Sequence, residues 1–245
     1  MGERYADGVA RGAYVMHLGT VPYRDAWDLQ RSLAGAVSQG AIPDTVLMLE
    51  HPPVVTLGRR TDESAELHLP ADAAVEIVET DRGGKSTFHG PGQLVCYPIL
   101  DLKRHGRDVK QYVRELEEAV IRTVAPFGLE GQRLEGLTGV WVGRPPRKIA
   151  SIGVHVSRWV TTHGYALNVD LDPAPFTDWI TACGLEDATF TTIARETGKP
   201  VTVAEVRPHA VTALGEVFGL EFEELPAGDG IGLWTQPVHG ELAKR

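Results

Sequence analysis

Two side chains in this sequence could together form an activated nucleophile. Cys183 stands between Ala182 and Gly184, small residues that would let a substrate reach the thiol, and Lys148 lies 35 positions earlier (183 − 148). A nearby cation favours the thiolate, which is the reactive form of cysteine. Taken alone, the pair decides little. A single cysteine is more often a small buried residue, and a lysine in an arginine-rich segment is more often a solvated turn residue.

A glycine-rich segment at 82–93, RGGKSTFHGPGQ, could let a ligand approach the backbone. Gly83 and Gly84 are adjacent and carry no side chain that would block such an approach. A tight hairpin turn would need the same residues, and the sequence alone favours neither reading. Cys96 follows in the apolar run LVCYPIL at 94–100, so we expect this second cysteine in the core.

Six motifs occur along the chain in the order typical of one enzyme family. They are Glu50-His51-Pro52, Gly58-Arg59-Arg60, the glycine-rich segment, the Lys148 segment, the run THGYALN at 162–168, and Ala182-Cys183-Gly184. Together they resemble the lipoyl(octanoyl) transferase family, the octanoyl-[acyl-carrier-protein]:protein N-octanoyltransferases, over about residues 14–218. Any one of these motifs alone would mean little, but all six in order are highly specific.

The resemblance implies roles for particular residues. It places a catalytic dyad at Cys183 and Lys148. It places the acyl pocket at three segments: Arg82, Gly83, Gly84, Lys85, Ser86, Thr87, Phe88 and His89; Ser151, Ile152 and Gly153; and Gly164, Tyr165 and Ala166. We expect Gly153 and Gly164 to leave room for a linear acyl chain against the backbone. His89 and His163 could orient the dyad or donate to an acyl oxygen, or could be structural, and His51 and Arg59 are weaker supporting candidates.

The implied activity is an acyl transfer that needs no cofactor. An octanoyl group would pass from octanoyl-acyl carrier protein, through a cysteine thioester, to a lysine ε-amine. The implied acceptors are lipoyl domains of 2-oxoacid dehydrogenase E2 subunits and the glycine cleavage H protein, in the first step of endogenous protein lipoylation. With a pKa near 10.4, only about 0.04% of a lysine amine is unprotonated at pH 7. A covalent acyl-enzyme divides this difficult reaction into two easier steps.

Two other readings stay open. An ATP-dependent lipoate or biotin protein ligase would form an acyl-adenylate and would need no cysteine nucleophile, so dependence on ATP discriminates it. A non-catalytic module that binds acylated carrier proteins would keep its activity in cells after Cys183→Ala.

Composition excludes several other classes of protein. A net charge of −9 argues against nucleic acid as the main partner. No apolar run approaches the ~20 residues that span a bilayer, and residues 1–7 resemble neither a signal nor a transit peptide. No metal-binding or Walker A motif is present. Two cysteines form no disulfide framework, and a working thiol suits the cytoplasm.

An acidic enzyme that docks acidic carrier domains needs a local basic surface. We expect that surface at the mouth of the site, from six basic residues in the segments assigned to it: Arg59, Arg60, Lys85, Arg144, Arg147 and Lys148.

The hydrophobic pattern predicts an α+β protein without a βαβ rhythm. Helices are expected at 21–39 and 109–127, with a last helix opened by the capping box of Thr202 and Glu205. Strands are expected at 14–18, 44–49, 54–57, 73–80, 94–100, 139–142, 149–156 and 165–169. We expect one domain at 12–225, with terminal extensions at 1–11 and 226–245. The resemblance implies the mixed, helix-flanked sheet of the biotin/lipoate protein ligase catalytic domain.

Overall fold

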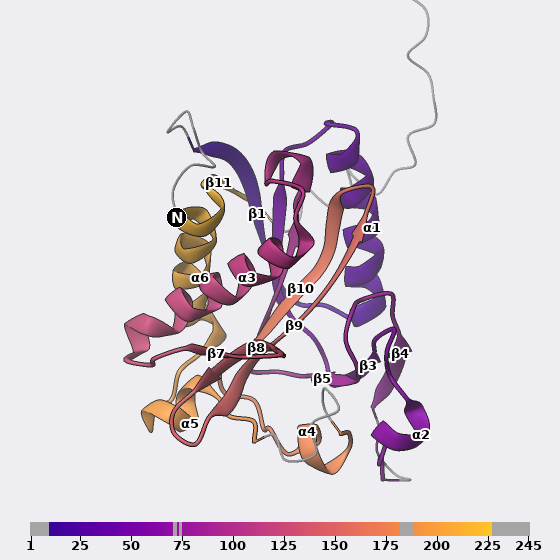
Figure 1. The fold of residues 1–245 in the computed structure, drawn as a ribbon, viewed down its shortest axis with the longest axis vertical. Helices are drawn as coiled ribbons and strands as arrows, with labels where there is room; N and C mark the ends of the chain where they lie inside the picture. The colour runs from indigo at the N-terminus through magenta and orange to yellow at the C-terminus, as the bar shows by residue number, and fades with distance from the viewer. Residues whose placement is uncertain (1–9, 71–72, 74, 182–188, 227–245) are drawn as a thin grey trace, which may run out of the picture.

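An eight-stranded mixed sheet forms the centre of the molecule (Figure 1). The computed structural model describes residues 10–70, 73, 75–181 and 189–226. In spatial order the strands are β11 (Leu220–Leu225), β1 (Arg11–Thr20), β2 (Thr45–Glu50), β6 (Gln93–Ile99), β10 (Val160–Asn168), β9 (Arg147–Ser157), β8 (Leu137–Val142) and β7 (Gln132–Leu134). β1 runs parallel to β11 and to β2, and the other neighbouring strands pair antiparallel. The predicted mixed sheet is confirmed.

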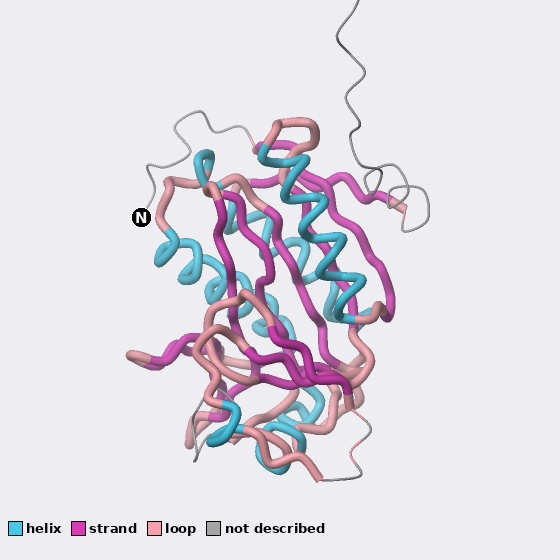
Figure 2. Tube along the Cα trace, turned by 90° about the vertical axis from the view of Figure 1, so that its right-hand side faces the viewer, coloured by secondary structure: helices cyan, strands magenta, loops and turns pink. Residues whose placement is uncertain are grey.

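Both faces of this sheet are covered by helices, so its central strands are apolar on both sides. In β2, Val46 and Met48 belong to one core while Leu47 and Leu49 belong to the other, as the two-residue period of a strand requires. Helix α1 (Tyr23–Ser38) covers the Leu47 face, and α3 (Val109–Val124) and α6 (Val203–Phe218) pack together on the Val46 face (Figures 1 and 2).

The long helices begin and end where the sequence predicts. Asp108 caps α3 by accepting from the Gln111 amide at 3.0 Å, and Gly128, with a φ of 77°, follows the 3₁₀ turn Ala125–Phe127 that ends the helix. At the start of α6 the predicted capping box between Thr202 and Glu205 is present. No helix among the described residues is long and apolar enough to cross a membrane.

A small second sheet lies beside one end of the large one. Its strands, in the order β4-β3-β5, are Glu76–Glu79, Val54–Leu57 and Thr87–His89. The strand predicted at 73–80 is shorter than expected, and β5 was not predicted because it lies inside the glycine-rich segment. The remaining elements are α2 (Glu63–Glu66), α4 (Pro175–Asp178), α5 (Ile193–Thr197) and a 3₁₀ turn at Leu102–Arg104.

Candidate active site

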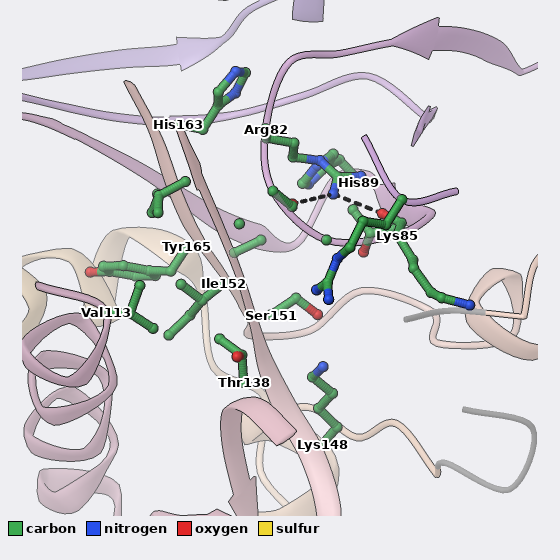
Figure 3. Close-up of a pocket in the computed structure, with 18 of the residues that line it drawn as sticks. Arg82, Lys85, His89, Val113, Thr138, Lys148, Ser151, Ile152, His163 and Tyr165 are labelled. Atoms are coloured by element: carbon green, nitrogen blue, oxygen red, sulfur yellow. Dashed lines mark hydrogen bonds between the residues drawn. The ribbon is translucent and has the colours of Figure 1, made fainter. Parts of the chain in front are cut away.

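A cavity of about 380 Å³ lies where the glycine-rich segment meets strands β9 and β10 (Figure 3). Lys148 and His163 line this cavity, together with all but two residues of the three segments assigned to the acyl pocket. The two exceptions are Ser86 and Phe88. The residues of these segments that line the cavity are Arg82, Gly83, Gly84, Lys85, Thr87, His89, Ser151, Ile152, Gly153, Gly164, Tyr165 and Ala166. These segments are far apart in the sequence. The structure therefore brings most of the predicted site residues to one place.

Lys148 is a buried residue of β9, and its side chain is only 2% exposed. Its Nζ lies 5.0 Å from the centroid of the Trp141 ring, within range of a cation–π contact. The backbone of Lys148 is hydrogen-bonded to the residues that follow position 188. The Lys148 amide donates to the carbonyl of Thr189 at 2.8 Å, and the Thr191 amide donates to the carbonyl of Lys148 at 3.0 Å. The alternative of a solvated turn lysine is therefore wrong.

The predicted basic cluster is divided between two places. Arg60, Lys85 and Lys148 line the main cavity. Arg147 instead makes a paired salt bridge with Glu196, with Nε at 2.7 Å from Oε1 and Nη2 at 2.6 Å from Oε2. Arg144 and Glu196 line a separate, smaller cavity. The expectation that all six basic residues gather at one mouth is wrong for Arg144, which lies in the turn before β9, and for Arg147, because adjacent residues of a strand point to opposite faces. Arg59 does not line the main cavity either.

Arg82 organises the glycine-rich segment from inside. Its guanidinium is largely buried and donates to the carbonyl of Thr56 and to that of Lys85, both at 2.7 Å. The segment is also hydrogen-bonded to the residues that follow β3. The amides of Arg59 and Arg60 donate to the carbonyls of Arg82 and Gly84, both at 3.1 Å. Arg59 thus supports the segment through its backbone, while its side chain is exposed and does not line the cavity.

Gly153 and Gly164 line the cavity, and neighbouring backbone leaves no room for a side chain at either position. A Cβ on Gly153 would lie 2.9 Å from the carbonyl oxygen of Gly83. A Cβ on Gly164 would collide with the carbonyl oxygen of Cys96 and lie 2.7 Å from Cδ of Pro98. Both distances are shorter than real Cβ contacts, so these glycines are required by the close approach of neighbouring backbone. That they also leave room for an acyl chain stays a prediction.

Ser86 and Phe88 point away from the cavity. The Ser86 hydroxyl donates to Glu66 Oε2 at 2.7 Å, and Nζ of Lys85 lies 2.9 Å from Glu66 Oε1. Burial alone would raise the pKa of Glu66, but the hydrogen bonds from Lys85 and Ser86 lower it below its ordinary value. Phe88 packs edge-on against Phe176. Both residues hold the glycine-rich segment from the side away from the cavity. Successive side chains along β5 and the residues just before it face opposite sides.

Cys183 lies outside the described residues, but the residues on both sides of segment 182–188 are placed. On the upstream side, the Thr181 amide donates to the carbonyl of Glu66 at 2.9 Å. On the downstream side, Thr189 accepts from Lys148. The two anchors belong to elements that support the glycine-rich segment and carry Lys148.

His163 holds an unusual backbone conformation and a full set of partners. Its φ of 57° is in the left-handed region, which is uncommon for a residue with a side chain. Its amide donates to Gln30 Oε1 at 2.6 Å, and its Nε2 lies 2.8 Å from Asp81 Oδ1. Burial lowers the pKa of His163, although Asp81 acts in the opposite direction. The ring is therefore neutral at pH 7, with Nε2 donating to Asp81 and Nδ1 accepting from the Tyr23 hydroxyl at 3.3 Å.

His51 is fully buried and does not line the cavity. Its Nδ1 donates to the carbonyl of Val21 at 2.6 Å, and its Nε2 accepts from the Tyr97 hydroxyl at 2.8 Å. Burial lowers the pKa of His51 to about 4, so it is neutral at physiological pH. Its position fits a structural residue behind the cavity.

Tyr23 and Tyr97 line the cavity and were not expected there. Tyr23 is the first residue of α1 and Tyr97 belongs to an apolar strand, so each has an ordinary place in the core pattern. Val113 of α3 and Thr138 of β8 also contribute and were equally missed. The sequence carries no local signal for these four, because only the packing of distant elements brings them to the cavity.

Comparison with known proteins identifies the family of the region that bears the cavity. Residues 22–215 match the family described as the lipoyl protein ligase A/B catalytic domain. An octanoyltransferase of Chloroflexus aurantiacus is 51% identical over 211 residues, which cover 84% of this chain and 94% of that protein. An octanoyltransferase of Mycobacterium tuberculosis is also 51% identical, over 219 residues covering 89% and 90% of the two chains.

Solved structures agree on the fold. A bi-partite lipoate protein ligase of Thermoplasma acidophilum superposes with a TM-score of 0.72 at 15% identity, covering 91% of this chain and 90% of that chain. Lipoate-protein ligase A bound with ATP superposes with a TM-score of 0.69 at 13% identity, covering 92% of each chain. At such identities the likeness shows the fold, and the family follows from the sequence matches. The chain belongs to the lipoyl protein ligase A/B catalytic-domain family.

Proposed function

We propose that this protein is an octanoyltransferase with a Cys183/Lys148 dyad. It takes an octanoyl group from octanoyl-acyl carrier protein and places it on a lysine of lipoyl domains, including those of 2-oxoacid dehydrogenase E2 subunits and the glycine cleavage H protein. The observation that supports this most strongly is the 51% identity to octanoyltransferases over nearly their whole length. The catalytic domain is proposed to span residues 12–225.

The first half-reaction acylates the enzyme. The Cys183 thiolate attacks the carbonyl carbon of the carrier thioester, and the carbon–sulfur bond to the carrier breaks. The departing carrier sulfur takes a proton from the Lys148 ammonium. Exchange of one thioester for another is nearly neutral in energy, so a cysteine nucleophile loses little at this step.

The second half-reaction transfers the acyl group. The unprotonated amine of the acceptor lysine attacks the carbonyl of the Cys183 thioester, forming the amide bond and releasing the thiolate. The proton lost by the amine passes to the neutral Lys148, which restores the ion pair. Lys148 thus serves as acid in the first half and base in the second. Lys148 lines the cavity, so it is placed to exchange a proton with a group bound there.

The chain anchors around segment 182–188 support the proposed dyad. Thr181 and Thr189 are the described residues that flank the segment containing Cys183. Thr181 is bonded to Glu66, the same residue that holds Lys85 and Ser86. On the other side Thr189 is bonded to Lys148 itself. The residues on the two sides of this segment are thus bonded to a support of the glycine-rich segment and to Lys148.

ATP dependence distinguishes this proposal from a ligase. We expect the purified protein to octanoylate a lipoyl domain from octanoyl-acyl carrier protein with no nucleotide present, as measured by the intact mass of the lipoyl domain. Transfer from free octanoate that requires ATP would identify a ligase. If Cys183→Ala preserved octanoylation in cells that lack any other source of it, the protein would be a binding module.

Cys96 provides a matched control for the proposed nucleophile. It is fully buried in β6, and burial raises the pKa of its thiol to about 12, so it carries almost no thiolate at neutral pH. Cys96→Ser should cost about 1–3 kcal/mol of unfolding free energy, because it buries a hydroxyl among apolar groups. Transfer at a temperature where the variant is folded should stay close to wild type. A folded Cys96→Ser protein that forms no acyl-enzyme would reverse the assignment of the two cysteines.

A further inference from the structure

Four rings line the part of the cavity around His163, away from Lys148 (Figure 3). We define the ring wall as Tyr23, His89, Tyr97 and His163, which come from α1, β5, β6 and β10 and all line the cavity. Each is at most 6% exposed. Figure 3 shows His163 and Lys148 at opposite ends of the labelled residues, with Ser151 between them. An acyl chain attached beside Lys148 and running along the cavity would meet the ring wall with its free end.

The polar atoms of the ring wall are largely engaged with one another or with residues behind them. The Tyr23 hydroxyl donates to His163 Nδ1 at 3.3 Å, and the Tyr97 hydroxyl donates to His51 Nε2 at 2.8 Å. His89 Nδ1 lies 2.7 Å from Gln93 Oε1. Gln93 must present its oxygen there, because its Nε2 donates to the carbonyl of Phe88 and to Asn168 Oδ1. The hydroxyls therefore require no polar ligand, and an aliphatic chain end can rest against the rings.

The ring wall is backed by packed residues and cannot recede. His51 and Gln30 behind it are fully buried, and Gln30 accepts from the His163 amide. Tyr23 lies at the centre, since its ring is 5.0 Å from His51, 5.8 Å from His89 and 6.4 Å from Trp27 between centroids. Its ring is nearly parallel to that of His89, with 22° between the planes.

We propose that Tyr23 is a specificity-determining residue that sets the maximum length of the acyl chain. This inference rests on the proposed octanoyl transfer. A chain longer than the distance from the thioester to the Tyr23 ring would have to displace a side chain that four neighbours hold in place. A shorter chain would leave part of the wall without a contact. Neither effect requires Tyr23 to touch the reacting atoms.

The test is the acyl-length profile of purified full-length enzyme, measured as kcat/KM with hexanoyl, octanoyl, decanoyl, dodecanoyl and tetradecanoyl carrier protein. Wild type should prefer octanoyl. In Tyr23→Ala the preference should move to decanoyl or dodecanoyl, and the ratio of dodecanoyl to octanoyl should rise at least about tenfold, since one buried methylene contributes about fourfold. Tyr23→Phe keeps the ring and should keep the profile.

Val113 supplies a matched control at a different part of the lining. It belongs to α3, lines the same cavity and lies beside Tyr165, away from His163 (Figure 3). Val113→Ala also enlarges the cavity, yet it should leave the length profile unchanged. If the length profile shifted in Val113→Ala but not in Tyr23→Ala, the end of the acyl chain would lie near Val113 and not at the ring wall, which would overturn the proposal.

The outcomes separate this inference from the proposed function. If wild type transfers octanoyl and a folded Tyr23→Ala retains the wild-type profile, only the role of Tyr23 is wrong. If wild type transfers no acyl group of any length, the proposed function fails and the inference fails with it. Should Tyr23→Ala unfold, Tyr23→Leu retains more of the packing and should still raise the decanoyl-to-octanoyl ratio severalfold. An unchanged ratio in that variant would equally contradict the proposal.

Discussion

Cys183→Ser is expected to reduce octanoyl transfer at least about a thousandfold. A serine hydroxyl is hardly ionised at neutral pH, and a lysine alone is poorly suited to deprotonate it. The measurement is the rate of octanoyl addition to a lipoyl domain, followed by mass. Circular dichroism would confirm that the variant is folded.

Cys96→Ser provides the control for this experiment, because it makes the same chemical change at a buried cysteine of the core. The two variants together distinguish loss of a nucleophile from a general effect of removing a thiol. Near wild-type transfer by Cys183→Ser would exclude a cysteine thioester on the reaction path.

Lys148→Arg is expected to separate the two roles of Lys148. Arginine keeps the positive charge but does not readily give up a proton. The cysteine should therefore still react with a thiol reagent at neutral pH, because a nearby cation continues to favour the thiolate. Octanoyl transfer should fall by about a hundredfold or more, the size typical of a lost general acid–base. The two rates are measured on the same preparation.

Lys148→Met is the companion variant, since it removes the charge from a buried side chain of similar length. It should lose both the rapid thiol reaction at neutral pH and the transfer. If Lys148→Arg instead transferred octanoyl at nearly the wild-type rate, Lys148 would act only through its charge. The base would then have to be another group that reaches the reacting atoms.

The periodic parts of the sequence predicted the fold well. Helices α1 and α3 and strand β2 carry strong hydrophobic patterns, and the structure contains each of them within about two residues of the expected bounds at most ends. The short strand β5 and the acidic strand β11 carry no such pattern. β5 is three residues long in a glycine-rich segment, and β11 is a six-residue edge strand in which three residues are glutamates, two of them adjacent. Both depend on partners distant in sequence.

The sequence predicted most of the residues that line the site, but it did not predict the structural reasons that place them there. Sequence motifs identified most of the lining and chose Lys148 for the dyad, but they wrongly placed Arg147 beside it at the mouth of the site. That distinction depends on where β9 begins, because one strand position turns one side chain toward the cavity and the next toward Glu196. The need for glycine at 164 comes from the backbone of the neighbouring strand β6, which is distant in sequence.

The ring wall shows the limit of local reasoning most clearly. Tyr23 and His163 are 140 positions apart, and their contact arises only when α1 packs on β10. A tyrosine at the start of a helix has no property in the sequence that marks it as part of a cavity.

The central claim is that the octanoyl group is carried on the Cys183 thiol, and intact-protein mass spectrometry tests it most directly. The purified enzyme is mixed with octanoyl-acyl carrier protein without an acceptor, quenched in acid and then digested to locate the adduct. We expect one added octanoyl mass, on the peptide that contains Cys183, which disappears when a lipoyl domain is supplied. An adduct on Cys96, or transfer to the lipoyl domain with no acyl-enzyme on either cysteine at any time, would contradict the account.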